Sequence, residues 1–153
     1  MIIEINKKKI FSTDVGDTFD KTKQTIILLH GSGQSHIVWS LTDQYLADEG
    51  YNVFALDLPG HGNSEGPSLT SIEAMSTWLN EFIEHLKIKN VILIGHSQGC
   101  LLTLEFTKNF PQKTSKIIFV AGSYAIPVNE RLIELSLSGN FEALNLMMKW
   151  GYG

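Results

Sequence analysis

The stretch VILIGHSQGCLL, residues 91–102, decides the fold that we expect for this chain. Four apolar residues lead into Gly95-His96-Ser97-Gln98-Gly99, and the apolar spacing of a helix follows. A serine between two glycines at a strand-to-helix junction is the layout of a nucleophile elbow, in which the serine backbone is strained. Glycines suit the flanking positions because a Cβ atom there would meet neighbouring backbone. A chance match is the alternative, but the readable strand and helix on either side favour the elbow.

Continuous apolar runs elsewhere in the chain predict further buried strands, which cover residues 25–29, 52–57 and 116–121. Continuous rather than alternating apolarity is typical of parallel strands that are buried on both faces. Before them, residues 2–5 and 9–13 form a predicted hairpin that turns at residues 6–8, and a loop is expected over residues 14–23.

Helical patterns separate these strands. One helix is expected over residues 38–49, with apolar residues at Val38, Leu41, Tyr45 and Leu46. A second should follow a capping box of Thr70 and Glu73, and a third runs from the elbow to about residue 110. The alternation predicts an α/β fold with a doubly wound, mostly parallel sheet.

Composition excludes several classes of function. The chain has 153 residues and a net charge of -4, so it carries no basic footprint for nucleic acid. It contains no apolar run of membrane-spanning length and no signal-peptide core, and we therefore expect a cytoplasmic protein. Cys100 is the single cysteine, so no internal disulfide forms. No His, Cys or Asp cluster has metal-ligand spacing, and we expect neither metal nor cofactor.

The pattern changes after Gly122. We divide the chain into a core of residues 1–122 and a helical segment of residues 123–153, with helices over 128–137 and 141–150. Met147, Met148 and Trp150 make the second helix strongly apolar. Such stripes are usually core packing. The alternative is a lid whose Met147, Met148 and Trp150 contact an apolar substrate, because methionine adapts to irregular shapes.

A glycine-rich turn, His30-Gly31-Ser32-Gly33, follows the first predicted sheet strand. Its N–H groups could stabilise a developing negative charge. A phosphate-binding loop would carry a Gly-x-x-x-x-Gly-Lys pattern, which this sequence lacks. A simple tight turn is the third interpretation, and the turn alone does not choose between the first and the third.

Three motifs together resemble the N-terminal part of an α/β-hydrolase-fold serine hydrolase. They are HGSG at residues 30–33, DLPGHGNS at 57–64 and GHSQG at 95–99. The resemblance implies that Ser97 is the nucleophile and that the backbone N–H groups of Ser32 and Gln98 form an oxyanion hole. It implies an ester-like substrate, and the Met- and aromatic-rich lid favours a small apolar acyl or alcohol group. Carbon–carbon bond hydrolases, acyltransferases and cofactor-free haloperoxidases remain alternatives within the family.

The five histidines receive separate expectations. His30 and His61 match turn positions of the family and should fix loops. His96 should point away from the serine hydroxyl. His36 and His85 are expected at the surface.

One departure from the family pattern stands out: no Asp and no His follow Ser97. The family places an acid and then a histidine after the serine. We therefore expect a chain that is C-terminally incomplete, ends within the lid and is inactive or very weak alone. A non-catalytic binding or assembly protein, or a chain completed by a partner, are the alternatives. In the family's strand order, residues 117–120 form an open apolar edge, where we expect a homodimer or a complementary chain.

Overall fold

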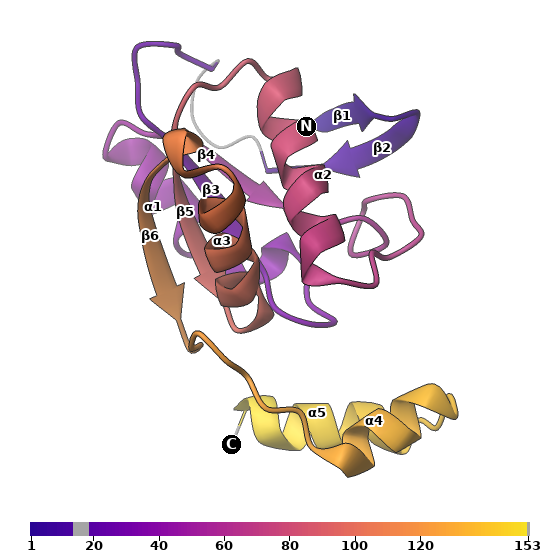
Figure 1. Ribbon diagram of the computed structural model, residues 1–153. Coiled ribbons are helices and arrows are strands. Elements are labelled where there is room, and N and C mark those ends of the chain that lie inside the picture. Colours follow the sequence, from indigo (N-terminus) through magenta and orange to yellow (C-terminus); the bar gives the residue numbers. More distant parts are fainter. Residues whose placement is uncertain (14–18, 153) are drawn as a thin grey trace.

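The computed structural model describes residues 1–13 and 19–152 and begins with a hairpin (Figure 1). Strands β1 (Ile2–Ile5) and β2 (Lys8–Phe11) pair antiparallel. Asn6 and Lys7 make the turn with φ angles of 51° and 63°, as a two-residue hairpin turn requires. The predicted hairpin is confirmed, although its second strand begins one residue earlier and ends at Phe11. Part of the loop expected over residues 14–23 lies outside the described residues.

Four parallel strands form the central sheet in the order β4-β3-β5-β6. These strands are β3 (Thr25–Leu29), β4 (Asn52–Leu56), β5 (Val91–His96) and β6 (Thr114–Val120). Every residue of β3 and β4 is buried, because side chains cover both faces of the sheet. The continuous apolar runs therefore predicted the position of these strands correctly, but the expectation that residues 116–121 are buried was wrong, because β6 is exposed along most of its length.

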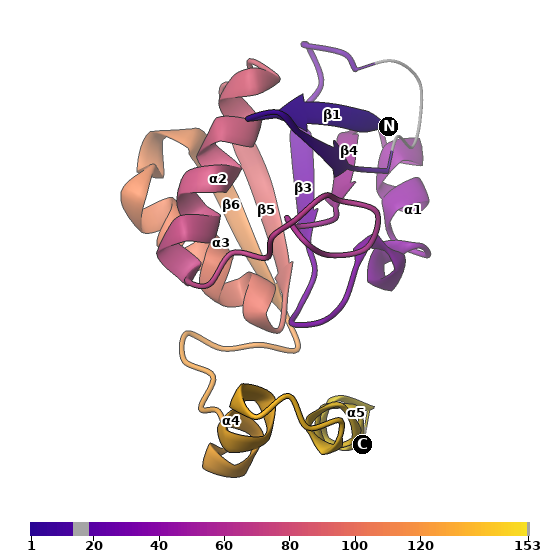
Figure 2. The ribbon, with the colours of Figure 1, turned by 90° about the vertical axis from the view of Figure 1, so that its right-hand side faces the viewer.

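Helices cover the two faces unequally (Figure 2). Helices α2 (Ile72–His85) and α3 (Gln98–Asn109) pack on one face, and α1 (Asp43–Asp48) lies on the other. The larger core lies beneath α2 and α3, where Leu79, Phe82 and Phe106 are fully buried. The predicted capping box was displaced by one residue. Ser71 caps α2, and its Oγ accepts a hydrogen bond from the Ala74 N–H at 3.1 Å.

The helix predicted over residues 38–49 was wrong in extent. The structure has a single 3-10 turn, η1 (His36–Trp39), and then the short helix α1. Trp39 is the buried residue of η1, whereas Leu41 is 93% exposed. Of the predicted stripe, Leu46 packs against the core beside Trp39, whereas Val38, Leu41 and Tyr45 face solvent.

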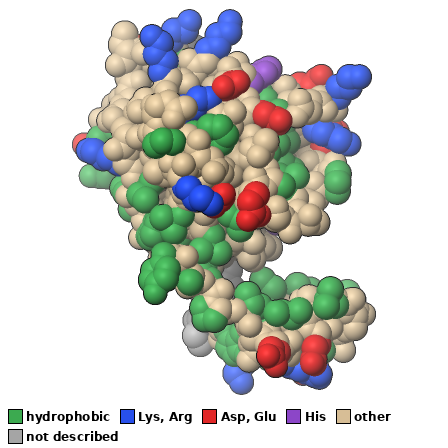
Figure 3. All heavy atoms as spheres, in the orientation of Figure 1, with side chains coloured by type: hydrophobic (Ala, Val, Ile, Leu, Met, Phe, Trp, Pro, Cys, Tyr) green, Lys and Arg blue, Asp and Glu red, His purple; other side chains and the backbone are tan. Residues whose placement is uncertain are grey.

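Strand β6 forms one edge of the sheet and pairs only with β5 among the described strands. Its residues Ile117, Ile118, Phe119 and Val120 are between 37% and 46% exposed. Figure 3 shows hydrophobic side chains gathered near the lower end of this strand. An apolar edge with unpaired backbone groups is a pairing surface.

Two helices follow the sheet and lie beyond the carboxyl ends of its strands (Figures 1 and 2). They are α4 (Glu130–Leu137), which the Asn129 side chain caps, and α5 (Glu142–Tyr152). Leu135 and Ala143 are buried within this pair. No helix in the described part of the chain combines the length and apolarity that crossing a membrane demands.

Candidate active site

Ser97 lies between β5 and α3 in a conformation that few residues adopt. Its φ and ψ are 52° and −116°, and its N–H donates to the Val120 carbonyl at 3.0 Å. Left-handed backbone of this kind is strained for a residue with a Cβ atom and persists only where the surroundings enforce it. A Cβ atom at Gly95 would overlap the Gly99 backbone, and one at Gly99 would overlap the Leu29 carbonyl. The two glycines therefore let α3 start directly against the sheet.

The turn of residues 30–33 lies against this elbow. A Cβ atom built on Gly31 would be 3.0 Å from the Ser97 Cβ. The Gly31 N–H is occupied, since it donates to Gln34 Oε1 at 3.0 Å. In contrast, the N–H groups of Ser32 and Gln98 donate to no acceptor within the described part of the chain. Gln98 directly follows Ser97, and Ser32 lies in the adjoining turn, where the Gly33 N–H likewise has no acceptor among the described residues.

His30 fixes two loops, as the sequence predicts. Because a carbonyl only accepts, Nδ1–H of His30 donates to the Gly31 carbonyl at 2.8 Å, and Nε2 accepts from the Leu58 N–H at 3.1 Å. The ring is fully buried, and this burial lowers the pKa of His30 below its ordinary value. His61 binds the Pro59 carbonyl through Nδ1 and fixes its own turn.

His36 is half-buried rather than exposed, although His85 is exposed as expected. Nδ1 of His36 lies 2.9 Å from Oδ1 of Asp57, and the His36 N–H donates to the same oxygen at 2.6 Å. Asp57 is completely buried and also accepts from the Asn63 N–H at 2.8 Å. A buried carboxylate needs such donors. Asp57 follows β4 and His36 follows β3. Because these strands are neighbours in the sheet, their order could have indicated that the two residues meet.

His96 is bonded to Gln34, a residue that the sequence analysis missed. Its Nδ1 lies 2.8 Å from Gln34 Oε1. The Trp39 ring stands perpendicular to the His96 ring, with centroids 6.4 Å apart. The Trp39 indole N–H is buried without a hydrogen-bond partner among the described residues. His96 thus joins the end of β5 to the segment of residues 34–39.

Acidic residues after Ser97 do not meet any of these histidines in the described structure. Glu105 on α3 binds Lys108 and Asn109, and the hydrogen bonds from their side chains, that of Asn109 first, lower its pKa. On the helical pair, Arg131 lies within 3.6 Å of Glu134 and 3.8 Å of Glu142. No cluster of three potential metal ligands occurs among the residues that the structure describes.

Of the predicted substrate-binding residues Met147, Met148 and Trp150, only Met147 approaches the candidate site. Met147 approaches the turn beside the elbow, since its Cε would lie 3.8 Å from a Cβ on Gly33. Met148 and Trp150 are 62% and 51% exposed. Helix α5 therefore brings Met147 to the candidate site and leaves the other two largely in solvent.

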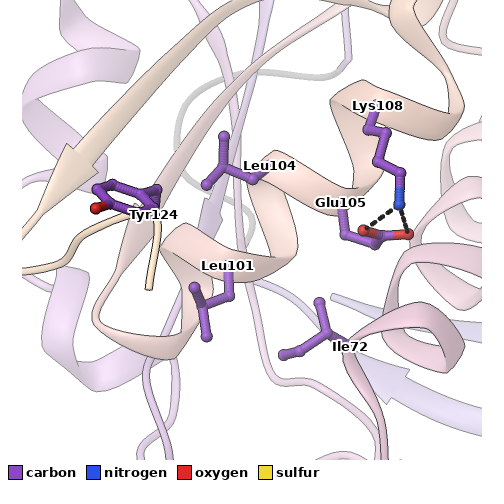
Figure 4. Close-up of a pocket in the computed structure, with 6 residues that line it drawn as sticks. All are labelled: Ile72, Leu101, Leu104, Glu105, Lys108 and Tyr124. Atoms are coloured by element: carbon purple, nitrogen blue, oxygen red, sulfur yellow. Dashed lines mark hydrogen bonds and ion pairs between the residues drawn. The ribbon is translucent and has the colours of Figure 1, made fainter. Parts of the chain in front are cut away.

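A separate cavity of about 360 Å³ opens along α3 (Figure 4). Its walls consist of Ile72, Leu101, Leu104, Glu105, Lys108 and Tyr124. None of these residues belongs to the elbow or to the turn of residues 30–33. The ion pair of Lys108 and Glu105 closes one side at 3.2 Å.

Comparison with known proteins identifies the family. Residues 24–144 match the family model described as the alpha/beta hydrolase fold, so the chain belongs to this family. It is 33% identical over 124 residues to an uncharacterized protein of Mycobacterium tuberculosis, an alignment covering 80% of this chain and 36% of that protein. It is 30% identical over 139 residues to a 2-hydroxy-6-oxononadienedioate/2-hydroxy-6-oxononatrienedioate hydrolase of Escherichia coli, covering 82% and 48%.

Solved structures agree on the fold. The structure of Est816, described as an N-acyl homoserine lactone degrading enzyme, superposes with a TM-score of 0.80 and 18% identity. The match covers 97% of this chain and 56% of that one. The chain thus spans roughly a third to a half of the length of the curated relatives above.

Proposed function

We propose that this chain carries the nucleophile and oxyanion hole of a serine hydrolase that acts on carboxylic acyl bonds. The observation that supports this most is the strained backbone of Ser97, held by Gly95 and Gly99 beside a turn with a free amide at Ser32. Backbone strain at a sharp strand-to-helix turn has a cost that is tolerated where it presents a reactive group.

The reaction follows from these groups. Ser97 Oγ attacks the acyl carbon while its proton passes to a base, and the carbonyl oxygen becomes an anion that the Ser32 and Gln98 N–H groups stabilise. Collapse of this intermediate breaks the bond to the leaving alcohol, which takes up the proton. Water then hydrolyses the acyl-enzyme and restores the Ser97 hydroxyl.

The substrate is proposed to have a small apolar group. Met147 next to Gly33 gives the site one apolar wall, with Met148 and Trp150 farther along the same helix. Hydrolysis of a 2-hydroxy-6-oxononadienedioate-type compound is a second candidate, because a relative of 30% identity bears that name. Side-by-side assays with short-chain p-nitrophenyl esters and with that compound distinguish the two candidates.

The residues after Ser97 include no histidine that could take its proton. They include no Asp either, and a serine hydroxyl without a base is a poor nucleophile at neutral pH. We therefore propose very weak activity for these 153 residues alone, with the acid and histidine supplied by further polypeptide. A non-catalytic binding or assembly protein is the competing function, and the same absence favours it.

Labelling with a fluorophosphonate tests the nucleophile. Ser97 Oγ forms a bond to phosphorus, fluoride leaves, and the hydroxyl proton passes to solvent. We expect a mass increase on the peptide containing Ser97, which Ser97→Ala abolishes and Ser136→Ala, on α4, preserves. Absence of labelling at pH 9, where hydroxide serves as base, would favour the non-catalytic function.

The oxyanion donor at Ser32 has its own test, because the donor is a backbone group. Ser32→Ala retains the N–H and should label at the normal rate, whereas Ser32→Pro removes it. Loss of one such donor costs about 10²–10³ in rate. Equal rates for the two variants, both folded by circular dichroism, would remove Ser32 from the oxyanion hole.

A further inference from the structure

The side chain of Gln34 joins the two segments that hold the proposed oxyanion donors. Its Oε1 accepts from the Gly31 N–H at 3.0 Å and lies 2.8 Å from His96 Nδ1. Gly31 immediately precedes Ser32, and His96 immediately precedes Ser97. One carboxamide oxygen therefore connects the turn after β3 to the elbow after β5.

We propose that Gln34 is a positioning residue, which sets the separation of the Ser32 and Gln98 N–H groups around the reacting oxygen. This inference rests on the proposed function of Ser97. Oxyanion donors act through preorganised geometry, and a displacement of about 1 Å can cost a hundredfold in rate. Without the bridge, the two donors would depend on separate loops.

The hydrogen bonds of Gln34 Oε1 determine which nitrogen of the His96 ring carries the proton. The oxygen that accepts from the Gly31 N–H has no proton to give, so His96 must carry its hydrogen on Nδ1. The bridge also occupies the Gly31 amide, so the free amides of the turn among the described residues are those of Ser32 and Gly33, of which Ser32 comes directly after the bridged residue. The Gln34 N–H closes the same turn by donating to the Gly31 carbonyl at 3.3 Å.

The space beside Gly31 at the bridge is too small for a side chain. A Cβ atom on Gly31 would be 2.8 Å from Gln34 Oε1, 3.0 Å from Ser97 Cβ and 3.2 Å from His96 Nδ1. The side chains of Gln34, His96 and Ser97 therefore surround the position that a side chain on residue 31 would occupy. Neutrality of the carboxamide matters as well, since a carboxylate at this place would repel the anion formed beside Ser97.

Two substitutions at this position separate geometry from charge. Gln34→Met keeps the length of the side chain and removes the acceptor, whereas Gln34→Glu keeps an acceptor and adds a negative charge. Gln44→Met is the matched control, because the Gln44 side chain makes an exposed hydrogen bond to Asp48 on α1, away from the elbow. The full chain is labelled with a fluorophosphonate at pH 9, and the saturation of the rate gives a maximal rate constant and a half-saturating concentration.

We expect Gln34→Met to lower the maximal rate constant about ten- to hundredfold with little change in the half-saturating concentration. Gln34→Glu should also react more slowly than the original protein, but added salt should restore part of its rate by screening the charge. Gln44→Met should match the original protein in both constants. Nitrogen-15 spectra of the His96 ring should show the Nδ1–H form in the original protein and in Gln44→Met, and its loss in Gln34→Met.

The outcomes separate this inference from the proposed function. Labelling of Gln34→Met at the original rate would overturn the positioning role while the nucleophile stands. An unchanged His96 ring spectrum in Gln34→Met would overturn the bridge itself. If the original protein is not labelled at all, the proposed function fails, and the positioning role fails with it even where the ring spectrum changes.

Discussion

His30 is a buried imidazole that must stay neutral to make both of its hydrogen bonds. Nε2 accepts from the buried Leu58 N–H, so a proton at Nε2 would break that bond. Burial lowers the pKa of His30 below its ordinary value near 6.5. The unfolded chain therefore binds more protons than the folded chain at mildly acidic pH. The stability linked to His30 is complete above about pH 6.5 and is lost as the pH falls through the folded pKa.

Replacing His30 tests this linkage. We expect His30→Leu to lose about 1–3 kcal/mol of unfolding free energy at pH 7.5, because the Leu58 N–H stays buried without an acceptor. The variant should also show a shallower loss of stability between pH 7 and pH 5, by up to about 1.4 kcal/mol per pH unit. Urea titrations at several pH values measure both effects. His85→Leu, at an exposed position, should keep the original pH dependence; the same slope in His30→Leu would contradict the assignment.

Sequence reasoning at the residue scale succeeded where backbone geometry alone dictates the residue. Gly95 and Gly99 were readable because no side chain fits beside the elbow. His36 and Gln34 were not readable in the same way. Each is bonded to a residue far away in the sequence, Asp57 and His96, and only the order of the parallel strands brings these pairs together.

Helix α2 begins one residue later than its capping motif predicts. Thr70 and Glu73 have the spacing of a capping box, yet Ser71 has extended backbone angles of −144° and 156° and provides the cap. The choice depends on where the preceding loop delivers the chain. The apolar residues Met75, Leu79, Phe82 and Ile83 recur at helical spacing in the sequence, and all four are buried on one face of α2.

The cap gives a prediction with a built-in control. Ser71→Ala should reduce the unfolding free energy by about 1 kcal/mol, since the Ala74 N–H loses its acceptor. Thr70→Ala should change it by less than about 0.5 kcal/mol, as is usual for exposed positions without a specific contact. Thermal or urea unfolding measures the unfolding free energy of both variants. A larger loss in Thr70→Ala than in Ser71→Ala would show that Thr70 caps the helix instead.

The whole molecule leaves one edge of its sheet apolar and unpaired among the described strands. Ile117–Val120 is apolar on both faces, and no helix of the described structure covers the outer side of β6. The strand order of the family predicted this edge, whereas the continuous apolar run by itself predicted a buried strand. Neither identifies what pairs there, since backbone hydrogen bonds to an edge carry little sequence information.

We expect self-association through β6. Ile118→Lys should shift the protein towards the monomer in sedimentation velocity experiments, because a charge on an edge strand opposes pairing. Ile133→Lys on α4 is the matched control, since the two isoleucines are 46% and 45% exposed. A shift caused by Ile133→Lys instead would place the contact on the helical pair. A strictly monomeric original protein at high concentration would contradict the prediction.

The strand order also governs the sequence of events during synthesis on the ribosome. Strand β3 lies inside the sheet, but its two neighbours arrive at different times: β4 follows soon, and β5 emerges only after α2. At roughly 5–20 residues per second, the nascent chain spends a few seconds with one side of β3 uncovered. During this interval the turn of residues 30–33 cannot pack against the elbow, because the segment around Ser97 has not yet been synthesised. The two halves of the site therefore meet only once the segment containing Ser97 has left the exit tunnel.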